Sequence, residues 1–519
     1  SPITLSPITL SPITLSPIAL SPITLSPITP LSHTAVSPPS PQVPPSVPKP
    51  PDVVDRDHVW QQLCDAWARP EPALLLGLGR RRAGKSWVLA RFARAVDGVY
   101  YQATKRTEAE QLAALSRIIG RHYSDAALQR GVGFAQWEDL LGYLTDRAAG
   151  APFLLVLDEF PYLADAAPAL PSILQAAWDH DWPNTRVRLV LNGSHISAMQ
   201  RLEAHDQPLY GRRTARLHFP PLHVAHVRRF VPQYSARDTL MAYGIFGGLP
   251  GHLALLRDDE DLAANVKRLM LDPSGRLADE AEHLLDAFLT DADVHNSVLQ
   301  AIASGERAWS RITSRVGKPG GSLSRPLRWL EDMHLVARTV PITEDPTTSR
   351  RALYSLTDPY IAFWHRFVAP LVASGETSVT SPDLLWQTRV APRLDDYMGG
   401  VFEDLCRTWV AHAQDTPFAP VRVGTWWDAK STNQIDVVAL GPNRELLVGE
   451  CKWGTFDERD LRTLRERTAL LQQELPASAR GGPVTYMAFS ARADWSPSVM
   501  REIETGAVIG VSGEQLLSE

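Results

Sequence analysis

The stretch spanning residues 74–90 constrains this chain more than any other feature, because its residue order is that of a phosphate-binding turn. Gly79, Gly84, Lys85 and Ser86 fit the spacing G-x-x-x-x-G-K-[ST]. Glycines permit a tight turn whose successive backbone N–H groups point at phosphate oxygens. The lysine adds positive charge at the β- and γ-phosphates, and the serine hydroxyl ligates Mg²⁺. The sequence therefore predicts a P-loop that binds ATP together with Mg²⁺.

The residues on both sides of this turn support the same prediction. Residues 73–76 form a short apolar run typical of a buried strand, and residues 87–95 have a helical pattern. The N-terminus of that helix would face the anion. The alternative is an ordinary Gly/Arg-rich turn before a helix. The residues expected to bind the nucleotide are Gly79, Arg80, Arg81, Arg82, Ala83, Gly84, Lys85 and Ser86.

A second apolar run ends in two carboxylates. Residues 153–157 are continuously apolar, as expected of a strand buried on both faces, and they lead into Asp158 and Glu159. We expect Asp158 to hold Mg²⁺ with Ser86, and Glu159 to act as the general base toward the attacking water. The alternative is a solvated acidic turn.

A third apolar run, residues 186–191, ends in Asn192, Gly193 and Ser194. Asn192 or Ser194 is placed to sense the γ-phosphate, and a plain N-G-S turn is the open alternative. Strands that alternate with helices in this way predict a parallel sheet whose ligand site lies at the strand C-termini.

Length and composition exclude several other classes of protein. A chain of 519 residues is too long for one core, so three or four domains are expected. The net charge of −6 means that any nucleic-acid contact needs a local basic patch. Cys64, Cys406 and Cys451 have no paired spacing, which argues against a disulfide framework or a zinc site and suits a reducing cytoplasm. No apolar run is long enough to cross a bilayer, so we expect a cytoplasmic protein without a membrane partner.

The first 51 residues are of low complexity. The unit SPITL recurs from residue 1 to 30, and a Pro/Ser/Val-rich run continues to residue 51. Proline at every fifth position blocks helix formation and removes backbone donors. The composition predicts a disordered tail over residues 1–51, with the ordered chain beginning near Val53.

Two later stretches complete a family resemblance. They are PLYGRR at residues 208–213 and YGIFGGLP at residues 243–250. With GRRRAGKS, LVLDE and LVLNGS, they make the chain from about Val53 onward resemble the archaeal-type P-loop ATPases, which are related to AAA+ and STAND NTPases. The resemblance implies that an arginine after the sensor strand approaches the γ-phosphate, with Arg212 as first candidate and Arg213 as second. A guanidinium there would stabilise charge on the transferred phosphoryl group, whereas the alternative is two solvated surface arginines.

The resemblance and the sequence pattern together divide the middle of the chain. The ATPase core is expected at residues 52–222 and a helical lid at 223–290, with GIFGGLP as its hinge. Over residues 291–372, three helical runs precede two short strands, which is the order of a winged helix-turn-helix.

This predicted winged helix is locally basic. Between residues 305 and 330 six basic residues accompany a single acid, Glu306, for a net charge of +5. Such a patch predicts contacts with the phosphates of duplex DNA, and the alternative is an internal packing module with a solvated basic face. The six are Arg307, Arg311, Arg315, Lys318, Arg325 and Arg328.

A second group of charged residues lies in the C-terminal part. A Ser/Thr/Gly-rich linker is expected near residues 373–381, before a last domain at 382–519. Glu450 and Lys452 lie two residues apart on an expected strand, so they project to the same side, and Asp436 lies on the adjacent arm of the hairpin. Two carboxylates and a lysine at one sheet edge can hold Mg²⁺ and orient a water for phosphodiester attack.

This D…E-x-K arrangement resembles the PD-(D/E)XK restriction-endonuclease fold. The resemblance implies Mg²⁺ ligation by Asp436 and Glu450 and a catalytic role for Lys452. Gln434 departs from the pattern, because family members often have an acid at that position. The alternative is that Glu450 and Lys452 form a plain ion pair, capped by Glu403.

The expected architecture is therefore α/β and multidomain. A P-loop parallel-sheet ATPase core carries a helical lid, a winged helix-turn-helix and a C-terminal restriction-endonuclease-like α/β domain. The expected function is Mg²⁺-dependent ATP hydrolysis coupled to DNA binding, with DNA cleavage as a further step. The alternatives are a STAND-like ATP-gated signalling switch with an inert nuclease-like module, and a nucleotide-binding scaffold without turnover. A homo-oligomer is compatible with each of these.

Overall fold

The computed structural model describes residues 47–286, 292–412 and 415–518, without the side chains of residues 196 and 284–286. Of the tail predicted for residues 1–51, residues 1–46 lie outside the described residues. Val47 and Lys49 already contact the helix that follows. The indole N–H of Trp60 donates to the carbonyl of Val47 at 2.8 Å, and Lys49 pairs with Asp57 at 2.7 Å. The packed chain therefore begins before Val53.

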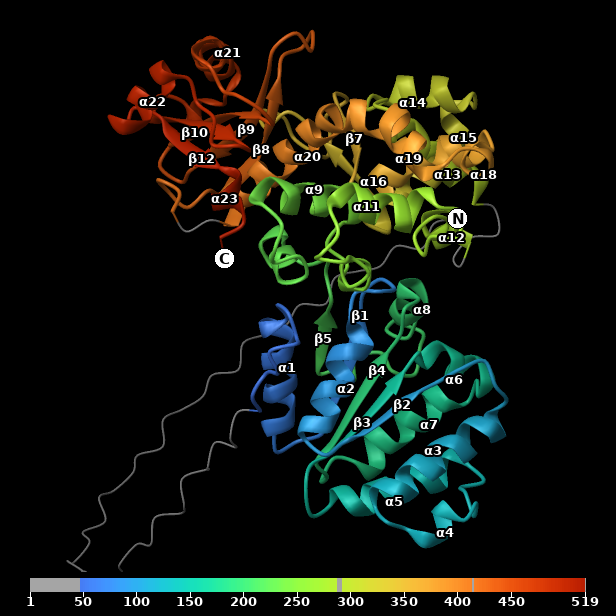
Figure 1. Cartoon of the computed structure of the whole chain (residues 1–519). Coiled ribbons are helices and arrows are strands. Elements are labelled where there is room, and N and C mark those ends of the chain that lie inside the picture. Colours follow the sequence, from blue (N-terminus) through green and yellow to red (C-terminus); the bar gives the residue numbers. More distant parts are fainter. Residues whose placement is uncertain (1–46, 287–291, 413–414, 519) are drawn as a thin grey trace, which may run out of the picture. The chain divides into compact units, whose positions relative to one another are not determined.

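Within residues 47–286, five parallel strands form one sheet in the order β2-β3-β4-β1-β5 (Figure 1). This confirms the predicted parallel sheet. The three central strands are buried along their whole length, which explains why their sequences are continuously apolar. The strands are β1 (Ala73–Leu78), β2 (Val99–Gln102), β3 (Phe153–Asp158), β4 (Val187–Asn192) and β5 (Ala215–His218).

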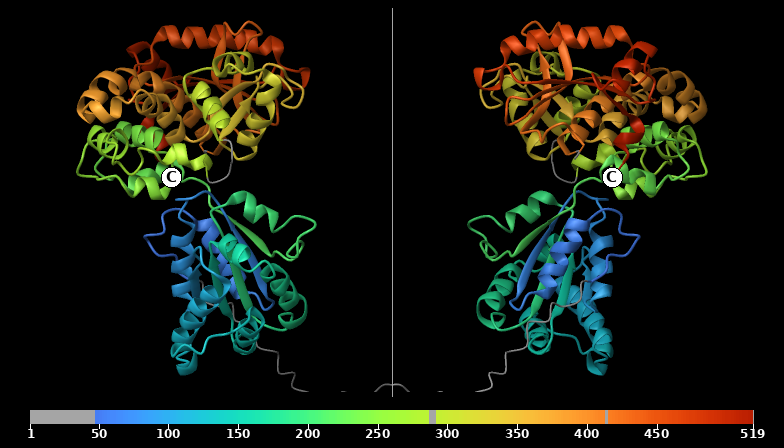
Figure 2. Two further views of the ribbon diagram at one scale, coloured as in Figure 1. Left: turned by 90° about the vertical axis from the view of Figure 1, so that its right-hand side faces the viewer. Right: turned by 90° about the vertical axis from the view of Figure 1, so that its left-hand side faces the viewer.

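Helices cover both faces of this sheet (Figure 2), because successive side chains of a strand point to opposite sides. Leu74 and Leu76 of β1 pack with α3, α5 and α7, whereas Leu75 packs on the other face with α1 and α2. The helices are α1 (Asp57–Ala68), α2 (Lys85–Ala95), α3 (Glu108–His122), α4 (Ala126–Gln129), α5 (Trp137–Ala148), α6 (Phe160–Ala166), α7 (Leu170–Ala176), the π-helical turn η1 (Ala177–Asp181) and α8 (Ile196–Arg201).

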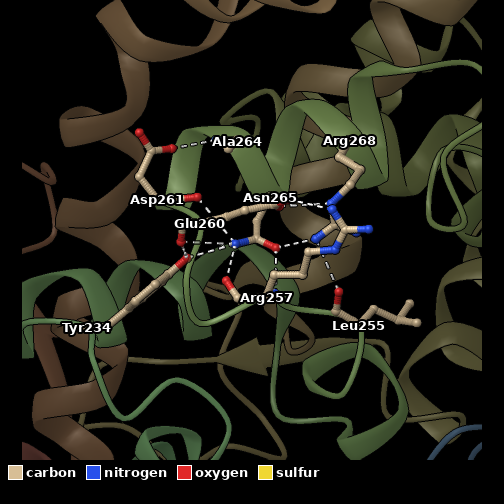
Figure 3. A network of polar contacts seen from close by, with 8 residues as sticks. All are labelled: Tyr234, Leu255, Arg257, Glu260, Asp261, Ala264, Asn265 and Arg268. Carbon is tan, nitrogen blue, oxygen red and sulfur yellow. Dashed lines mark hydrogen bonds and ion pairs between the residues drawn. The ribbon is translucent and has the colours of Figure 1, made fainter.

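The stretch after β5 is helical, in line with its sequence pattern. Its connection from α10 to α11 is organised around the buried side chain of Asn265 (Figure 3). The amide nitrogen of Asn265 donates to the hydroxyl of Tyr234 and to the carbonyl of Arg257, each at 2.9 Å, and the amide oxygen accepts from Arg268 at 2.5 Å. A buried amide with its hydrogen bonds satisfied fixes the local backbone. The elements are η2 (Val224–Arg229), α9 (Ala236–Phe246), α10 (Pro250–Leu253), α11 (Leu262–Val266), η3 (Lys267–Leu271) and α12 (Glu280–Asp286).

Three helices and an antiparallel strand pair follow, in the predicted order. We call residues 293–356 the three-helix segment. The loop between its strands packs against the C-terminal domain, since Ile342 N donates to Thr425 O at 2.9 Å and the Ile342 side chain is buried beside Trp426. The elements are α13 (Asp293–Ala303), α14 (Trp309–Val316), α15 (Gly320–Asp332), β6 (Val336–Thr339) and β7 (Leu353–Leu356).

The linker predicted near residues 373–381 is wrong, because this stretch is largely helical. Apolar residues at helical spacing on either side, among them Phe367, Leu371 and Leu385, are buried in the core. Their burial outweighs the Ser/Thr/Gly composition, and Gly375, at φ 74°, permits the break between two short helices. The elements are α16 (Pro359–Phe363), η4 (Trp364–Val368), α17 (Ala369–Ala373), α18 (Glu376–Val379), α19 (Pro382–Leu385) and η5 (Trp386–Val390).

A separate mixed sheet forms the C-terminal domain. Its strand order is β12-β11-β10-β9-β8, antiparallel from β8 to β10 and parallel from β10 to β12. Helix α20 packs on one face and α21 on the other. None of the helices within the described ranges combines the length and the apolarity needed to span a membrane. The elements are α20 (Ala391–His412), β8 (Arg422–Trp427), β9 (Gln434–Leu440), β10 (Leu446–Lys452), α21 (Glu458–Glu474), β11 (Val484–Ser490), α22 (Pro497–Glu504), β12 (Ile509–Ser512) and α23 (Gly513–Leu516).

Candidate functional site

The turn between β1 and α2 carries the predicted phosphate-binding residues. Arg82, at φ 67°, and Gly84, at φ 84°, both lie in the left-handed region, which turns the backbone sharply before α2. Lys85 is the first residue of α2, and its side chain is buried. Its ammonium group donates to the carbonyls of Gly79 at 2.7 Å and of Arg80 at 2.9 Å. The lysine therefore folds back over the loop that it follows.

Burial changes the acid–base behaviour of Lys85. Removal from water disfavours the ammonium form and lowers the pKa of Lys85 to about 8, although the nearby charges of Glu159 and Asp158 act in the opposite direction. The site thus brings Lys85 close to both carboxylates that follow β3, as the sequence predicted from the two motifs separately.

Asp158, the last residue of β3, is fully buried and held by three donors. Its Oδ1 accepts from the side-chain amide of Asn192 and from the backbone N–H of Glu159, the latter at 3.0 Å. Its Oδ2 accepts from the hydroxyl of Tyr100. Tyr100 was not a sequence candidate, because nothing in the VYYQ strand distinguishes it from a core tyrosine.

Glu159 lies at φ 53°, in the turn that begins α6, and its carboxylate is held by Ser194. Oε1 accepts from the Ser194 hydroxyl at 2.5 Å, and Oε2 accepts from the Ser194 backbone N–H at 3.1 Å. The same hydroxyl lies 3.5 Å from the Lys85 ammonium. Of the two residues proposed to sense the γ-phosphate, Ser194 lines the cavity described next, whereas Asn192 is buried against Asp158.

These groups border a cavity of about 510 Å³. Its polar lining includes Lys85, Ser86, Glu159 and Ser194. The chain before α1 and the helical stretch after β5 contribute apolar lining, which consists of Val53, Val54, Phe230, Pro250 and Ala254.

Arg56 also lines this cavity, and the sequence analysis did not select it. Its buried guanidinium donates to Pro220 O at 2.7 Å and to Ala83 O at 3.3 Å, and burial lowers its pKa. Arg56 therefore braces the phosphate turn against the chain after β5. An arginine between two aspartates just before the first helix is the signal that could have identified it.

Two arginines of the phosphate turn pair with carboxylates far along the chain. Arg80 pairs with Asp358, which also caps α16, and Arg82 pairs with Glu280 of α12 at 2.6 Å. Burial disfavours the charged form of Glu280, but the hydrogen bond from His252 and the charge of Arg82 outweigh it and lower the pKa. Arg81 lines the cavity. The loop thus contacts two later segments directly.

Arg212 and Arg213 are not brought to the cavity of their own chain. Arg212 makes a two-point pair with Asp179 of η1 at 2.6 and 2.8 Å, and Arg213 pairs with Glu203. The adjacent Thr214 N–H donates to Leu74 O near the start of β1, whereas the phosphate turn follows the end of β1. Both arginines therefore lie near the end of the sheet where its strands begin, away from the phosphate turn.

The predicted residues of the C-terminal domain come together where β9 begins and the antiparallel β10 ends. The ammonium of Lys452 lies 2.9 Å from Glu450 Oε1, and Asp436 accepts from the backbone N–H of Cys451 at 3.0 Å. Burial raises the pKa of Asp436, with a further contribution from Glu403, and burial together with the Asp436 charge raises the pKa of Glu450. Crowded, buried carboxylates of this kind gain from a nearby cation.

Gln434 donates to Asp436 at 3.4 Å, in the place where an acid was expected. Across residues 47–286, 292–412 and 415–518, no group of three or more His, Cys, Asp or Glu side chains is arranged to hold a metal ion. Any Mg²⁺ here would thus rely on two carboxylates and on oxygens of a substrate, which is a usual arrangement for this ion.

The basic patch lies on the surface of the three-helix segment. Its five cations on and between α14 and α15 are exposed, and in the described part of the chain none of them forms an ion pair. They are Arg311, Arg315, Lys318, Arg325 and Arg328. Arg307 is half-buried before α14.

A parallel sheet that carries a phosphate turn after its first strand, with an acidic pair at the end of a neighbouring strand, is the architecture of a P-loop ATPase domain. The match to protein families agrees. Residues 53–256 match the family described as an ATPase domain predominantly from Archaea, and residues 364–464 match a family described as archaeal and bacterial proteins of unknown function.

The individual proteins that are similar to this chain share a quarter or less of its residues over the matched region. An uncharacterized protein of Methanocaldococcus jannaschii is 25% identical over 420 residues, which cover 79% of this chain and 90% of that protein. The Walker-type ATPase of Pyrococcus abyssi is 21% identical, with a TM-score of 0.47, and the match covers 61% of this chain and 96% of that structure. The ORC2 protein of Aeropyrum pernix is 17% identical, with a TM-score of 0.36, over 62% of this chain and 92% of that structure.

Proposed function

We propose that this protein binds and hydrolyses ATP with Mg²⁺ in the cavity beside the phosphate turn. The observation that carries the proposal is that Lys85, Ser86, Asp158 and Glu159 lie close together. They are found where strands of the parallel sheet end, next to a cavity of about 510 Å³. Its apolar lining residues, with Arg56, suit a purine base, while its polar lining residues suit phosphates.

The oxygen donors at this edge fit Mg²⁺. A serine hydroxyl at the start of α2 and the buried carboxylate of Asp158 are hard ligands, and phosphates would supply further oxygens. Mg²⁺ bound there would neutralise charge on the β- and γ-phosphates. Lys85 would exchange its contacts with the carbonyls of Gly79 and Arg80 for phosphate oxygens, which restores hydrogen bonds to its ammonium group.

Glu159 is the residue that we assign to proton transfer. Its carboxylate can accept a proton from a water that attacks the γ-phosphate, once it exchanges at least one hydrogen bond with Ser194 for that water. Ser194 also lies near Lys85, so it is the better placed of the two candidate γ-phosphate sensors. Asn192 would instead orient Asp158.

The contacts of Arg80 and Arg82 suggest how nucleotide state could reach the rest of the chain. A triphosphate in the turn attracts both guanidinium groups and therefore competes with Asp358 and Glu280 for them. The loss of these pairs would release α16 and α12 from the ATPase domain. Coupling of this kind is common where phosphate contacts hold one of two conformations.

We further propose that the three-helix segment is a winged helix-turn-helix that binds duplex DNA through α14 and α15. The support is the set of exposed, unpaired cations described above, since phosphate contacts require free positive charge. The β6–β7 loop is less suited to this role, because it is packed on β8. The alternative is a STAND-like ATP-gated switch in which no DNA is bound.

The C-terminal domain has a second candidate function, cleavage of DNA. The specific observation is the pair of buried carboxylates, Asp436 and Glu450, with Lys452 at 2.9 Å from one of them. We propose that the domain has a restriction-endonuclease-like fold in which these residues bind Mg²⁺ and orient a water. In the switch alternative the same domain is an inert binding module.

Arg212 can serve catalysis only on another copy of the chain, given its position relative to its own cavity. We propose this role for an oligomer in which Arg212 reaches the γ-phosphate of a neighbour. Mixing Lys85→Ala with Arg212→Ala chains tests it. Hybrid oligomers should recover activity that neither variant has alone, and no recovery would refute the role in trans.

Phosphate release from ATP, measured with and without duplex DNA, tests the main proposal. Lys85→Ala and Glu159→Gln should each abolish turnover, whereas Lys105→Ala and Glu138→Gln, which change exposed residues of the same types, should not. Turnover that survives Lys85→Ala would refute the enzymatic proposal. Binding of ATP that is indifferent to Glu159→Gln, without turnover by the wild type, would indicate a scaffold.

DNA binding and cleavage are tested separately. Reversing the charge of Arg311, Arg315 and Arg325 should weaken duplex binding and flatten its salt dependence. Reversing the charge of three exposed arginines elsewhere controls for the change in net charge. These are Arg106, Arg117 and Arg121. Lys452→Ala should abolish Mg²⁺-dependent nicking and leave ATP turnover unchanged, and the absence of nicking by the wild type would favour the switch.

A further inference from the structure

Tyr100 occupies an unexpected position beside Asp158, one of the two residues assigned to Mg²⁺. Its hydroxyl donates to Asp158 Oδ2. The side chain of Ser86, the other residue, is near enough to lower the pKa of Tyr100 slightly against the larger effects of burial and of Asp158. Burial, followed by the charge of Asp158, raises its pKa well above the ordinary value, so the phenol keeps its proton.

The other contacts of Asp158 show why this hydroxyl matters. Oδ1 already accepts from Asn192 and from the N–H of Glu159, so Oδ2 is the oxygen with free capacity. Tyr100 is its hydrogen-bond donor. A cation held between Ser86 and Asp158 needs the same oxygen and repels the O–H proton that points at it.

We propose that Tyr100 is a positioning residue whose hydroxyl occupies the oxygen of Asp158 that the metal ion would use. This oxygen is Oδ2, and the Tyr100 hydroxyl satisfies it by donating a hydrogen bond. Loading of Mg²⁺ requires this hydroxyl to give up its contacts. Tyr100 therefore sets how strongly nucleotide binding depends on Mg²⁺, an inference that rests on the proposed ATP site.

The neighbouring residue offers a matched control. Tyr101 points to the other face of the sheet, where its hydroxyl donates to Gln111 of α3 and its ring joins the core that includes α3 and α5. Tyr101→Phe removes a buried hydroxyl from the same strand without touching Asp158. Both variants keep the aromatic ring, so both are expected to fold, which circular dichroism and thermal melting would check.

The experiment is a titration of Mg²⁺ into each protein in the presence of ADP, followed by calorimetry and by the fluorescence of a labelled ADP. Tyr100→Phe should bind Mg²⁺ about tenfold more tightly in the ADP complex, because a hydrogen bond to a charged group no longer competes. Tyr101→Phe should match the wild type. Unchanged or weaker Mg²⁺ affinity in Tyr100→Phe would overturn the inference. If the wild type binds no ADP at all, the proposed function fails instead.

Discussion

The ion pair between Arg80 and Asp358 can be tested by a substitution that changes a single interaction. The two carboxylate oxygens of Asp358 have separate tasks: Oδ1 accepts from the N–H groups of Tyr360 at 2.8 Å and Ile361 at 3.3 Å, whereas Oδ2 accepts from Arg80. Asparagine caps helices about as well as aspartate. Asp358→Asn therefore keeps the cap of α16 and removes the charge that holds Arg80.

The size of the effect follows from the burial of the pair. The Asp358 side chain is 5% exposed and that of Arg80 is 17% exposed. Exposed pairs contribute about 0–1 kcal/mol, and breaking a fully buried pair costs about 3–5 kcal/mol. A partly buried pair lies between these limits, at about 1–2 kcal/mol. If a triphosphate must break this pair, its loss in Asp358→Asn should tighten nucleotide binding about 5- to 30-fold.

Calorimetric titration with a non-hydrolysable ATP analogue measures this change. Asp383→Asn is the control, because Asp383 pairs with Lys267 at 2.6 Å on the surface and is 71% exposed. In a double-mutant cycle, Arg80→Ala should cancel the gain from Asp358→Asn. Equal affinity of Asp358→Asn and wild type, or a gain that persists without Arg80, would refute the competition between phosphate and Asp358.

Three further predictions concern charge and packing. The pKa of Lys85 is about 8, and phosphates favour its ammonium form. Nucleotide binding above pH 8 should therefore take up a proton, and nucleotide affinity should fall by up to about tenfold for each pH unit above 8. Calorimetry at pH 9 in two buffers of different ionisation enthalpy measures that proton, and its absence would contradict the assignment. Burial raises the pKa of Glu450 to about 7, so its contribution to stability is present at low pH and is lost as pH rises through 7. Glu450→Gln should therefore raise the melting temperature by a few degrees at pH 8 and by less at pH 5, and a gain that shrinks with rising pH would show that the sign is wrong. Ile342→Ala should destabilise the protein by about 2–4 kcal/mol, because Ile342 is 3% exposed beside Trp426. Val379→Ala, at an 86% exposed position, is the matched control in denaturant titrations, and equal stability of the two variants would refute the docking of the β6–β7 loop.

Much of the ATPase domain could be predicted from the sequence because its signals are local. The phosphate turn, the apolar run before Asp158 and the one before Asn192 each lie within a few residues, and burial on both faces leaves a direct mark on composition. The pairing of Glu450 with Lys452 was predictable for the same reason, since alternate residues of a strand share a side.

The linker near residues 373–381 shows where local composition misleads. Serine, threonine and glycine favour turns when nothing else acts, but the neighbouring apolar side chains gain more by burial in a helical arrangement. A short window does not contain the partners of those side chains.

The sequence by itself determined which groups we propose for triphosphate binding, because that chemistry resides in residue types at fixed short spacing. Only the tertiary structure decided which groups hold them: Tyr100 on Asp158, Ser194 on Glu159 and Asp358 on Arg80, which lie 58, 35 and 278 positions apart along the chain. It also placed Arg212 beside Asp179 and away from the cavity. Contacts between residues so far apart depend on how strands and helices pack, and no local pattern of residues records that packing.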